Sequence, residues 1–492
     1  MSKRILAILL ALMTLIPLLV ACQDSTEPVV GTDPVTTEAP ETMDPTKDEV
    51  PDQDFKEREF LILLPHPEDL GANNYDVEED SGDAIISAIY RRNSEIERRF
   101  NITITTKSEG DSGTLPSMFQ PYALSNEDKV DMVAVPFYQS AKPMIVQDMI
   151  LPWNGIPRID LKRDYWNESV TETLALLGKY YLLVGDVNWT TMRETVACFF
   201  NQDVADSNES IVGDLYQTVR DDKWTYDKML EIIKDMPRDN GDGTWDDKDT
   251  YGAVLNLTTG SYGLIYSCDF QTVRMTKDGP VPQYNTRKMT DILGIAKRLL
   301  AENHNTYSEI FDFTSDSKGI PLFFDNRALF YLGQLRHSES FRDKETDYGI
   351  IPYPKFDENQ KKYVTYANQW GLSCALPCTA TDLNRTGSIL EAMSAVSRRY
   401  LVPAYYEKTL MGKIKRDEES EEMLNIIFSN VLYDFGMSYL CDFNLYPVSN
   451  LWSGNTAIQS WYRRNENKIV KNYWELYEHV YEQVNGVKPE MP

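Results

Sequence analysis

An alternation of short apolar runs with amphipathic stretches constrains the fold of this chain more than any other feature. The run EFLILLP at 59–65 has the length of a buried strand, and residues 83–100 place apolar side chains on one helical face and basic side chains on the other. The runs NITITTKS at 101–108 and VDMVAVP at 130–136 are again typical of strands. Strand, helix and strand at this spacing predict βαβ units, and therefore an α/β fold with a largely parallel sheet.

The first 22 residues have the composition of an export signal. Lys3 and Arg4 precede an apolar run at 5–20, and the run ends in the sequence LVACQD. The ending Leu-Val-Ala-Cys resembles the bacterial lipobox, in which the cysteine becomes the lipidated first residue of the mature chain. Residues 1–22 are therefore predicted to be a lipoprotein signal peptide with Cys22 as the lipidation site. An ordinary signal peptide with a chance cysteine is the alternative.

Residues 23–55 are rich in Thr, Pro, Asp and Glu and contain few large apolar side chains. Such a segment cannot bury enough surface to offset its ordering entropy, so it is predicted to be a disordered acidic tether. A lipid anchor followed by a tether would hold the remaining chain at the outer face of the bacterial cytoplasmic membrane. No other segment is long and apolar enough to be a transmembrane helix candidate.

The charge and the cysteines exclude two classes of protein. The formal net charge is −27, and removal of Lys3 and Arg4 with the signal peptide would make it −29, which argues against nucleic acid as a partner. A zinc site is not indicated, because the pair in CALPC lacks a second cysteine pair or nearby histidines. Buried free thiols are expected for the five cysteines beyond Cys22, which are Cys198, Cys268, Cys374, Cys378 and Cys441.

Several segments follow one another in a diagnostic order. They are AIYRRNSEIERRFNITI, ETVACFFNQDV, KWTYDKMLEIIKDM with the turn NGDG, DYGIIPYPK and QKKYVTYANQWG. This ordered set resembles the family 1 extracellular solute-binding proteins of bacterial ABC importers, the sugar-binding type, over nearly everything after residue 56. The resemblance implies a periplasmic-binding-protein-like fold, with two discontinuous α/β lobes around a ligand cleft. It assigns lobe 1 to residues 56–195 and 371–403, and lobe 2 to residues 198–368 and 406–492.

The stretch RDNGDGTWDDKDTYG at 238–252 matches a calcium-binding loop at all but one position. Asn240, Asp242, Asp246 and Asp249 fall on ligand positions, whereas Arg238 stands where the first acidic ligand belongs. Calcium needs six to eight oxygen ligands, and the loss of a carboxylate weakens the site. The favoured interpretation is a polar turn whose carboxylates accept hydrogen bonds from local backbone N–H groups, with weak calcium binding as the alternative. No other cofactor is predicted.

The candidate ligand-binding residues come from the positions that the resemblance assigns to ligand-facing loops. Glu194 lies seven residues before Asn201, as an acidic ligand-binding residue does in maltodextrin binders. Leu335 and Arg336 stand where the family often places an aromatic side chain, so a stacked sugar is not implied at that point. The chain has nine Trp and 29 Tyr residues, and sugar sites combine flat rings with hydrogen-bonding groups. The candidates are Tyr138, Gln139, Trp189, Glu194, Arg336, Trp370 and Trp452.

The sequence lacks the common catalytic motifs. There is no H-E-x-x-H, P-loop, G-x-S-x-G or dinucleotide-binding motif, and no catalytic residue is nominated. The predicted function is a surface-anchored solute-binding lipoprotein, monomeric and not an enzyme. It is expected to capture a carbohydrate, an oligosaccharide, by lobe closure and to deliver it to ABC permease subunits. The alternatives are a binder of peptide or another polar solute, and a surface glycan hydrolase.

Overall fold

The computed structural model describes most of the chain after residue 45. The described residues are 44, 46–65, 75–108, 110–111, 113–137, 140–257, 259–276, 278–309, 317–341, 344–410, 418–440 and 458–490. Residues 1–44 and 45–492 form separate units, and the account below concerns the second unit. The predicted lipidation site Cys22 and the candidates Tyr138, Gln139 and Trp452 lie outside the described residues.

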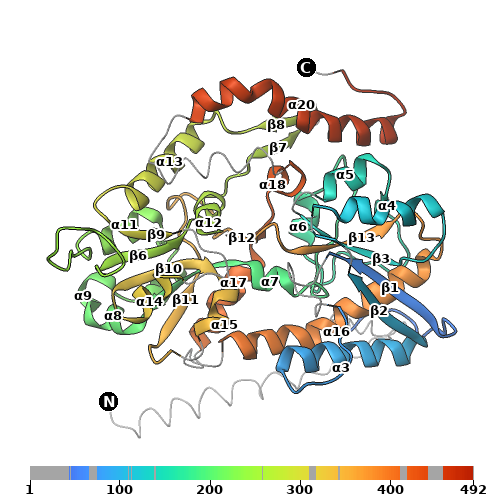
Figure 1. Cartoon of the computed structure of the whole chain (residues 1–492), viewed down its shortest axis with the longest axis horizontal. Coiled ribbons are helices and arrows are strands. Elements are labelled where there is room, and N and C mark those ends of the chain that lie inside the picture. Colours follow the sequence, from blue (N-terminus) through green and yellow to red (C-terminus); the bar gives the residue numbers. More distant parts are fainter. Residues whose placement is uncertain are drawn as a thin grey trace, which may run out of the picture. The chain divides into compact units, whose positions relative to one another are not determined.

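The first five-stranded sheet defines lobe 1, and its strand order is β2-β1-β3-β13-β4 (Figure 1). Its strands are β1 (Arg58–Leu64), β2 (Ile102–Ser108), β3 (Met132–Pro136), β4 (Ile150–Leu151) and β13 (Leu372–Pro377). β1 runs parallel to β2 and β3, which confirms the predicted βαβ arrangement. β13 runs antiparallel between β3 and β4, so a strand from much later in the chain completes the sheet.

The second five-stranded sheet defines lobe 2, and its strand order is β11-β5-β10-β6-β9 (Figure 1). Its strands are β5 (Val196–Asn201), β6 (Tyr251–Asn256), β9 (Thr306–Glu309), β10 (Ala328–Gln334) and β11 (Tyr348–Ile351). β10, β6 and β9 are parallel, and Leu332 of β10 lies beside Leu255 of β6. β5 is antiparallel to both of its neighbours, β10 and β11.

Two short strand pairs and the helices complete the architecture. β12 (Thr365–Tyr366) pairs with β14 (Val431–Leu432), and β7 (Val273–Thr276) pairs with β8 (Gly279–Pro282). The shorter helices are α4 (Leu115–Ser125), α5 (Ala141–Val146), α6 (Glu168–Thr173), α7 (Thr190–Glu194), α8 (Gln202–Ser207), α9 (Glu209–Val212), α10 (Leu215–Arg220), α11 (Tyr226–Ile233), α12 (Thr259–Ser267), α13 (Arg287–Leu300), α14 (Gly319–Phe324), η3 (Leu335–His337), α15 (Ser338–Phe341), α17 (Glu418–Ser429) and α18 (Phe435–Leu440).

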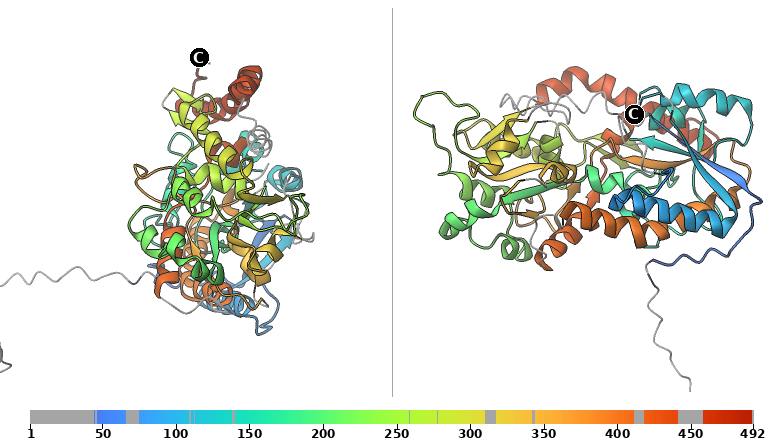
Figure 2. Two further views of the ribbon diagram at one scale, coloured as in Figure 1. Left: turned by 90° about the vertical axis from the view of Figure 1, so that its left-hand side faces the viewer. Right: turned by 60° about the horizontal axis from the view of Figure 1, so that its bottom comes forward.

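Helices α3 (Ala84–Phe100) and α16 (Leu383–Leu410) pack along each other beside the first sheet (Figure 2). The Asp83 carboxylate caps α3 by accepting hydrogen bonds from the backbone N–H groups of Ile85 and Ile86, a typical N-terminal cap. α3 ends at Phe100, and the capping residue Asn101 adopts a left-handed conformation with φ of 49°. Because residues 383–410 form one helix, the predicted lobe division between residues 403 and 406 falls inside α16.

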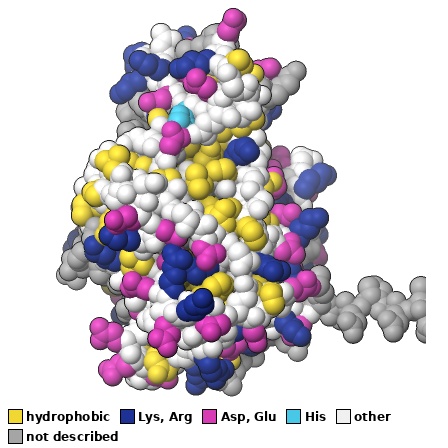
Figure 3. All heavy atoms as spheres, turned by 90° about the vertical axis from the view of Figure 1, so that its right-hand side faces the viewer, with side chains coloured by type: hydrophobic (Ala, Val, Ile, Leu, Met, Phe, Trp, Pro, Cys, Tyr) yellow, Lys and Arg dark blue, Asp and Glu magenta, His cyan; other side chains and the backbone are white. Residues whose placement is uncertain are grey.

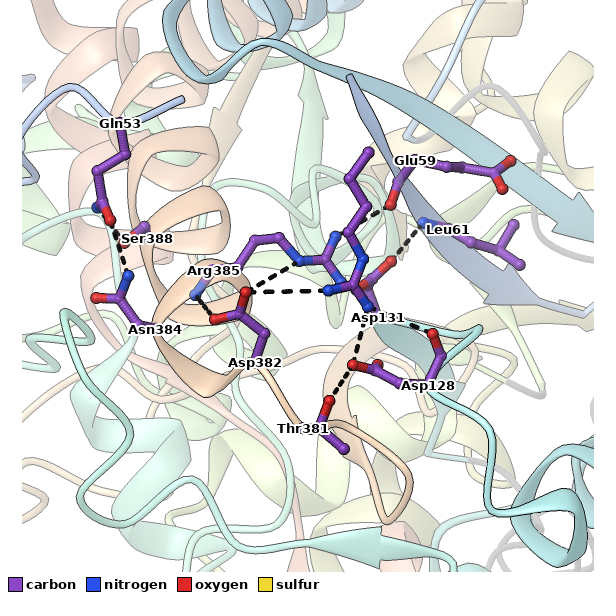
Figure 4. Close-up of polar contacts among 11 residues, drawn as sticks. Gln53, Glu59, Leu61, Asp128, Asp131, Thr381, Asp382, Asn384, Arg385 and Ser388 are labelled. Carbon is purple, nitrogen blue, oxygen red and sulfur yellow. Dashed lines mark hydrogen bonds and ion pairs between the residues drawn. The ribbon is translucent and has the colours of Figure 1, made fainter. Parts of the chain in front are cut away.

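The segment immediately before β1 packs against lobe 1. Arg99 of α3 pairs with the carboxylates of Asp48 at 2.7 Å and Asp52 at 2.9 Å, and the Phe55 ring stacks on Phe100. The Gln53 side chain forms hydrogen bonds with the Ser388 and Asn384 side chains of α16, as the left side of Figure 4 shows. Residues 46–55 therefore belong to the folded region, and the predicted end of the tether at residue 55 is wrong. The sequence analysis missed these contacts because they are polar and aromatic pairs formed with distant residues.

A buried ion pair ties the start of α16 to the first sheet (Figure 4). Arg385, 1% exposed, pairs with the buried carboxylate of Asp131 and donates to the Glu59 carbonyl oxygen at 3.0 Å. Asp131 also accepts from the Leu61 backbone N–H at 2.9 Å. Burial raises the pKa of Asp131 to about 6, and Arg385 opposes that rise. The pair satisfies backbone groups at the strand ends and fixes how α16 docks on the sheet.

Charges of both signs share the described surface. On the face shown in Figure 3, Lys and Arg side chains lie among Asp and Glu side chains, with apolar side chains between them. The net negative charge of the chain is therefore not gathered into a single acidic area on that face. None of the helices in the described part of the chain combines the length and the apolar character that a membrane span requires.

Candidate functional site

Two segments of the chain connect the lobes and lie side by side. The first contains α7 and leads into β5, and the second, residues 366–371, leads into β13. The Asn368 backbone N–H donates to the Glu194 carbonyl oxygen at 3.0 Å, and Thr195 forms an antiparallel bridge with Ala367. The Leu335 N–H donates to the Thr195 carbonyl oxygen at 2.8 Å, so the end of β10 joins them. We call residues 189–195 and 366–371 the crossing segments.

The carboxyl ends of parallel strands from both sheets lie at the crossing segments. In lobe 2, β10 ends at Gln334, and the next residue, Leu335, donates its N–H to Thr195 of the first crossing segment. In lobe 1, β3 ends at Pro136, and the next residue, Phe137, donates its N–H to the Gly371 carbonyl oxygen at 3.4 Å. Open α/β sheets bind ligands outside the carboxyl ends of their strands. This region is therefore the candidate functional site.

Glu194 and Arg336, both predicted from the sequence, form a buried ion pair at this site. The Arg336 Nη1 atom lies 2.8 Å from the Glu194 Oε1 atom, and the side chains are 13% and 4% exposed. Gln334 donates from its amide nitrogen to the other Glu194 carboxylate oxygen. Burial lowers the pKa of Arg336, and Glu194 opposes that effect. The carboxylate is held by two partners at the end of β10, which fixes its orientation.

His337 supports this pair and was missed by the sequence analysis. Its Nδ1 atom accepts a hydrogen bond from the Gln334 backbone N–H at 3.2 Å and lies 2.9 Å from the Tyr331 hydroxyl. Burial, Arg336 and Arg193 lower the pKa of His337 to about 3, so the imidazole is neutral at physiological pH. No sequence signal singled out His337, because its role depends on contacts with Tyr331 and Gln334 that form only in the folded chain.

Trp189 lies in an apolar cluster at the start of the first crossing segment. Its ring packs 5.7 Å from the ring of Tyr405 in α16, and the Arg193 guanidinium lies 5.9 Å from the indole. Arg193 in turn pairs with Glu339 of α15 at 2.9 Å. The Trp189 side chain, 9% exposed, therefore connects the start of α7 to α16.

Trp370 lies on the second crossing segment. Its backbone N–H donates to the Asn368 side-chain oxygen at 3.3 Å, and its partly buried ring packs against the core of lobe 1. The structure thus brings Glu194 and Arg336 into direct contact and places Trp189 and Trp370 on the two segments beside them. Whether any of the four touches a ligand remains a prediction.

Tyr433, which follows β14, is a further residue that the sequence analysis missed. Its hydroxyl donates to the Thr191 hydroxyl at 3.3 Å, and its ring centroid lies 4.2 Å from that of Phe137. A Cβ atom added at Gly371 would lie 2.5 Å from the Tyr433 hydroxyl oxygen, so the close approach requires glycine there. Tyr433 therefore contacts both crossing segments and the end of β3.

A separate cavity of about 460 Å³ adjoins the first crossing segment on another side. Thr191 and Met192 line it from α7, and Arg398 and Asn425 line it from α16 and α17. Arg398 pairs with Asp186 at 2.5 Å within this lining. Glu194, Arg336 and Trp370 do not line it. Its residues come from both lobes.

The carboxylates of the 238–249 turn are occupied by backbone donors. Asp249 accepts from the N–H groups of Asn240 at 2.8 Å and Asp246 at 2.7 Å. Asp242 accepts from Thr244 at 2.8 Å, and Asp246 accepts from Lys248 at 2.8 Å. These bonds are those expected of the polar turn, and no group of acidic, histidine or cysteine side chains in the described residues is arranged to hold a metal ion. Calcium binding stays untested.

The cysteines of the described region carry free thiols, as predicted. Cys198, Cys268 and Cys374 are buried, and Cys378 is half-buried. Burial raises the pKa of Cys198, Cys268 and Cys374, so these thiols stay protonated and inert. Cys441 lies outside the described residues.

Comparison with known proteins gives matches at the level of structure. No protein-family model and no curated protein matches the chain. Among solved structures, a family 1 extracellular solute-binding protein from Bifidobacterium longum subsp. infantis matches with a TM-score of 0.53 at 11% identity, covering 86% of this chain and 99% of that one. The chain has the fold of the extracellular solute-binding proteins. The predicted α/β fold with two lobes is thereby confirmed.

Two further solute-binding proteins share this fold and differ in the ligand they hold. The ABC substrate-binding protein Lmo0181 from Listeria monocytogenes, in complex with cycloalternan, has a TM-score of 0.50 at 11% identity and covers 84% of this chain and 98% of that one. UgpB from Mycobacterium tuberculosis, in complex with glycerophosphocholine, has a TM-score of 0.53 at 10% identity and covers 85% of this chain and 97% of that one. The matched proteins are binding proteins.

Proposed function

We propose that this protein is a solute-binding protein that captures a carbohydrate between its lobes. The observation that carries the proposal is the Glu194–Arg336 pair, buried at the crossing segments where the strands of both sheets end. The fold of solute-binding proteins supports it, and so does the cycloalternan bound by the Listeria protein of that fold. Lobe closure around the ligand would create contacts that exist fully only in the closed arrangement, and these contacts would shift the population toward closure.

The chemistry of the pair favours a neutral, hydroxyl-rich ligand. Glu194 and Arg336 neutralise each other, so the site offers no excess charge to attract an ion. Both groups retain capacity for additional hydrogen bonds, since a carboxylate has about four lone-pair positions and a guanidinium has five N–H donors. Sugar hydroxyls both donate and accept, which matches a site holding a charged acceptor next to a charged donor. We infer binding rather than catalysis, because Glu194 is held by two partners.

A polar solute other than a sugar is the second candidate. It is favoured by the glycerophosphocholine bound to UgpB, whose structure matches this chain as well as that of the Bifidobacterium protein does. The remaining parts of the proposal come from the sequence: Cys22 as the lipidated residue, a position at the outer face of the cytoplasmic membrane, ABC permease subunits as partners, and a monomeric state. A peptide ligand and a glycan hydrolase remain the alternatives that the experiment below separates.

The proposal is tested by a ligand screen followed by analysis of the incubated ligand. A thermal-shift panel of mono- and oligosaccharides, peptides and glycerophosphocholine should yield stabilisation by a saccharide, because a ligand at 100 times its Kd adds about 2.7 kcal/mol to the free energy of unfolding. The saccharide should be recovered intact by mass spectrometry. Stabilisation by glycerophosphocholine alone would reject the carbohydrate and favour a polar solute as the ligand. Recovery of a cleaved saccharide would instead show that the protein is a hydrolase.

A further inference from the structure

The C-terminal helix α20 (Ile458–Asn485) is anchored in lobe 2 by aromatic packing. The ring of Trp461 meets the ring of Tyr284 edge-on at 5.5 Å, and the Tyr473 and Tyr284 hydroxyls lie 3.4 Å apart. Trp474 covers Gly279 of the β7–β8 hairpin, where an added Cβ atom would lie 2.7 Å from the indole. These contacts are buried and mainly aromatic, so they form the permanent attachment of the helix.

The same helix contacts lobe 1 through polar side chains. The Lys142 ammonium of α5 donates to the Asn472 carbonyl oxygen at 3.1 Å and pairs with Glu475 at 2.6 Å. His479 lies 3.1 Å from the Asp148 carboxylate. The Tyr181 hydroxyl donates to the Gln483 side-chain oxygen at 2.9 Å. The helix partners are residues 472, 475, 479 and 483, whose spacing of three and four places them on one face.

This second set of contacts lies apart from the crossing segments. In Figure 1, α20 runs along the top of the molecule across both lobes, whereas α7 lies near the centre. Helix α18 adds one bond of the same kind, because the Tyr439 hydroxyl donates to the Leu174 carbonyl oxygen at 2.7 Å. A rotation about the crossing segments would have to separate one set of α20 contacts. The polar set, in which Glu475 and Asp148 are 59% and 68% exposed, is the weaker of the two.

We propose that α20 is a latch: it stays fixed to lobe 2 and reversibly fastens lobe 1 through Lys142, Asp148 and Tyr181. The latch holds the lobes together in the arrangement of this structure, and its release permits them to separate. Its effect on ligand affinity rests on the proposed function, whereas its effect on lobe separation does not. Lys142 is a positioning residue in this scheme, because it acts on the lobes and not on a ligand.

The test compares latch variants with the wild type in the absence of added ligand. The variant Lys142→Met with Tyr181→Phe removes four polar contacts with α20, two to Asn472 and one each to Glu475 and Gln483, and keeps the apolar parts of both side chains. We expect a larger radius of gyration by small-angle scattering, and amide hydrogen exchange in residues 472–483 that is about tenfold faster. Lys488→Ala is the matched control, because Lys488 follows α20 and pairs with two residues of that helix, Glu478 at 3.2 Å and Glu482 at 3.6 Å.

Each outcome decides the proposal. An unchanged radius of gyration and unchanged exchange in the double variant overturn the latch, as does an equal change in Lys488→Ala. If the double variant loses its cooperative melting transition, Tyr181→Phe alone is measured, and the same two readouts apply with a smaller expected change. Titration of the wild type and the variant with maltotriose then addresses affinity: absence of binding by either protein rejects maltotriose as a ligand, and the scattering result stands independently.

Discussion

Replacing Glu194 by alanine should destabilise the fold far more than an ordinary surface change, because Arg336 would be left buried without its partner. The Arg336 side chain is 13% exposed and its guanidinium loses the bond of 2.8 Å to Glu194. Removing one member of a buried ion pair costs roughly 3–5 kcal/mol, whereas replacing both members by apolar groups is often close to neutral. We therefore expect the double variant Glu194→Ala with Arg336→Met to recover most of the stability that Glu194→Ala loses.

Urea unfolding followed by tryptophan fluorescence measures the four members of this double-mutant cycle. The matched control is Glu339→Ala, because Glu339 pairs with Arg193 in the same region but both side chains are more exposed, at 33% and 28%. The control should cost about 1 kcal/mol or less. Additive losses in the double variant, or equal losses in Glu194→Ala and Glu339→Ala, would refute the reasoning. Ligand affinity is best measured on Glu194→Gln, which keeps the shape of the side chain.

Three other predictions concern pH, anchoring and calcium. Glu391 of α16 is buried and accepts hydrogen bonds from the side chains of Tyr165 and Trp166. Burial raises its pKa from 4.5 to about 7, so the stability that its protonated form contributes below pH 4.5 is lost as the pH rises toward 7, by up to about 3 kcal/mol. The variant Glu391→Gln should flatten this dependence of the free energy of unfolding on pH, measured by urea titration. Cys22→Ala should release the protein into the medium or leave it unprocessed, whereas normal cleavage and membrane retention on fractionation would contradict the lipid anchor. A chelator should shift the melting temperature little if the 238–249 turn is structural, and a shift of many degrees would reveal a bound ion.

The parts of the fold that depend on local pattern could be predicted from the sequence. The short apolar run of β1 and the helical spacing of apolar residues in α3 indicate a strand and a helix from the local sequence alone. Glu194 was identified because it stands at a fixed spacing from Asn201 in a segment of familiar order. Its partnership with Arg336 could not be derived, because the two residues are 142 positions apart and meet only after both crossing segments form.

Side chains whose role is tertiary escaped the sequence analysis. Gln334 and His337 lie in an apolar strand and the turn after it, and nothing in their local pattern indicates that they hold a carboxylate and a strand end in place. The polar face of α20 has the sequence pattern of a solvent-exposed helix surface, and its contact with Lys142 of α5 forms only in the folded chain. Residues 46–55 have the composition of a tether, and they fold because Arg99 and Phe100 are presented by α3.

The position of β13 has a consequence for how the chain reaches its native state. In the antiparallel pairing of β13 with β3, Cys374 lies beside Ala134. The lobe 1 sheet therefore stays incomplete until about 240 residues beyond Ala134 have left the ribosome. Until then one edge of β3 exposes unpaired backbone groups on an apolar strand, which is a template for pairing with another chain. A chain that stops before residue 372 keeps this open edge, so premature termination would yield a species prone to association, and secretion in an unfolded form would delay that hazard until the whole sheet can close.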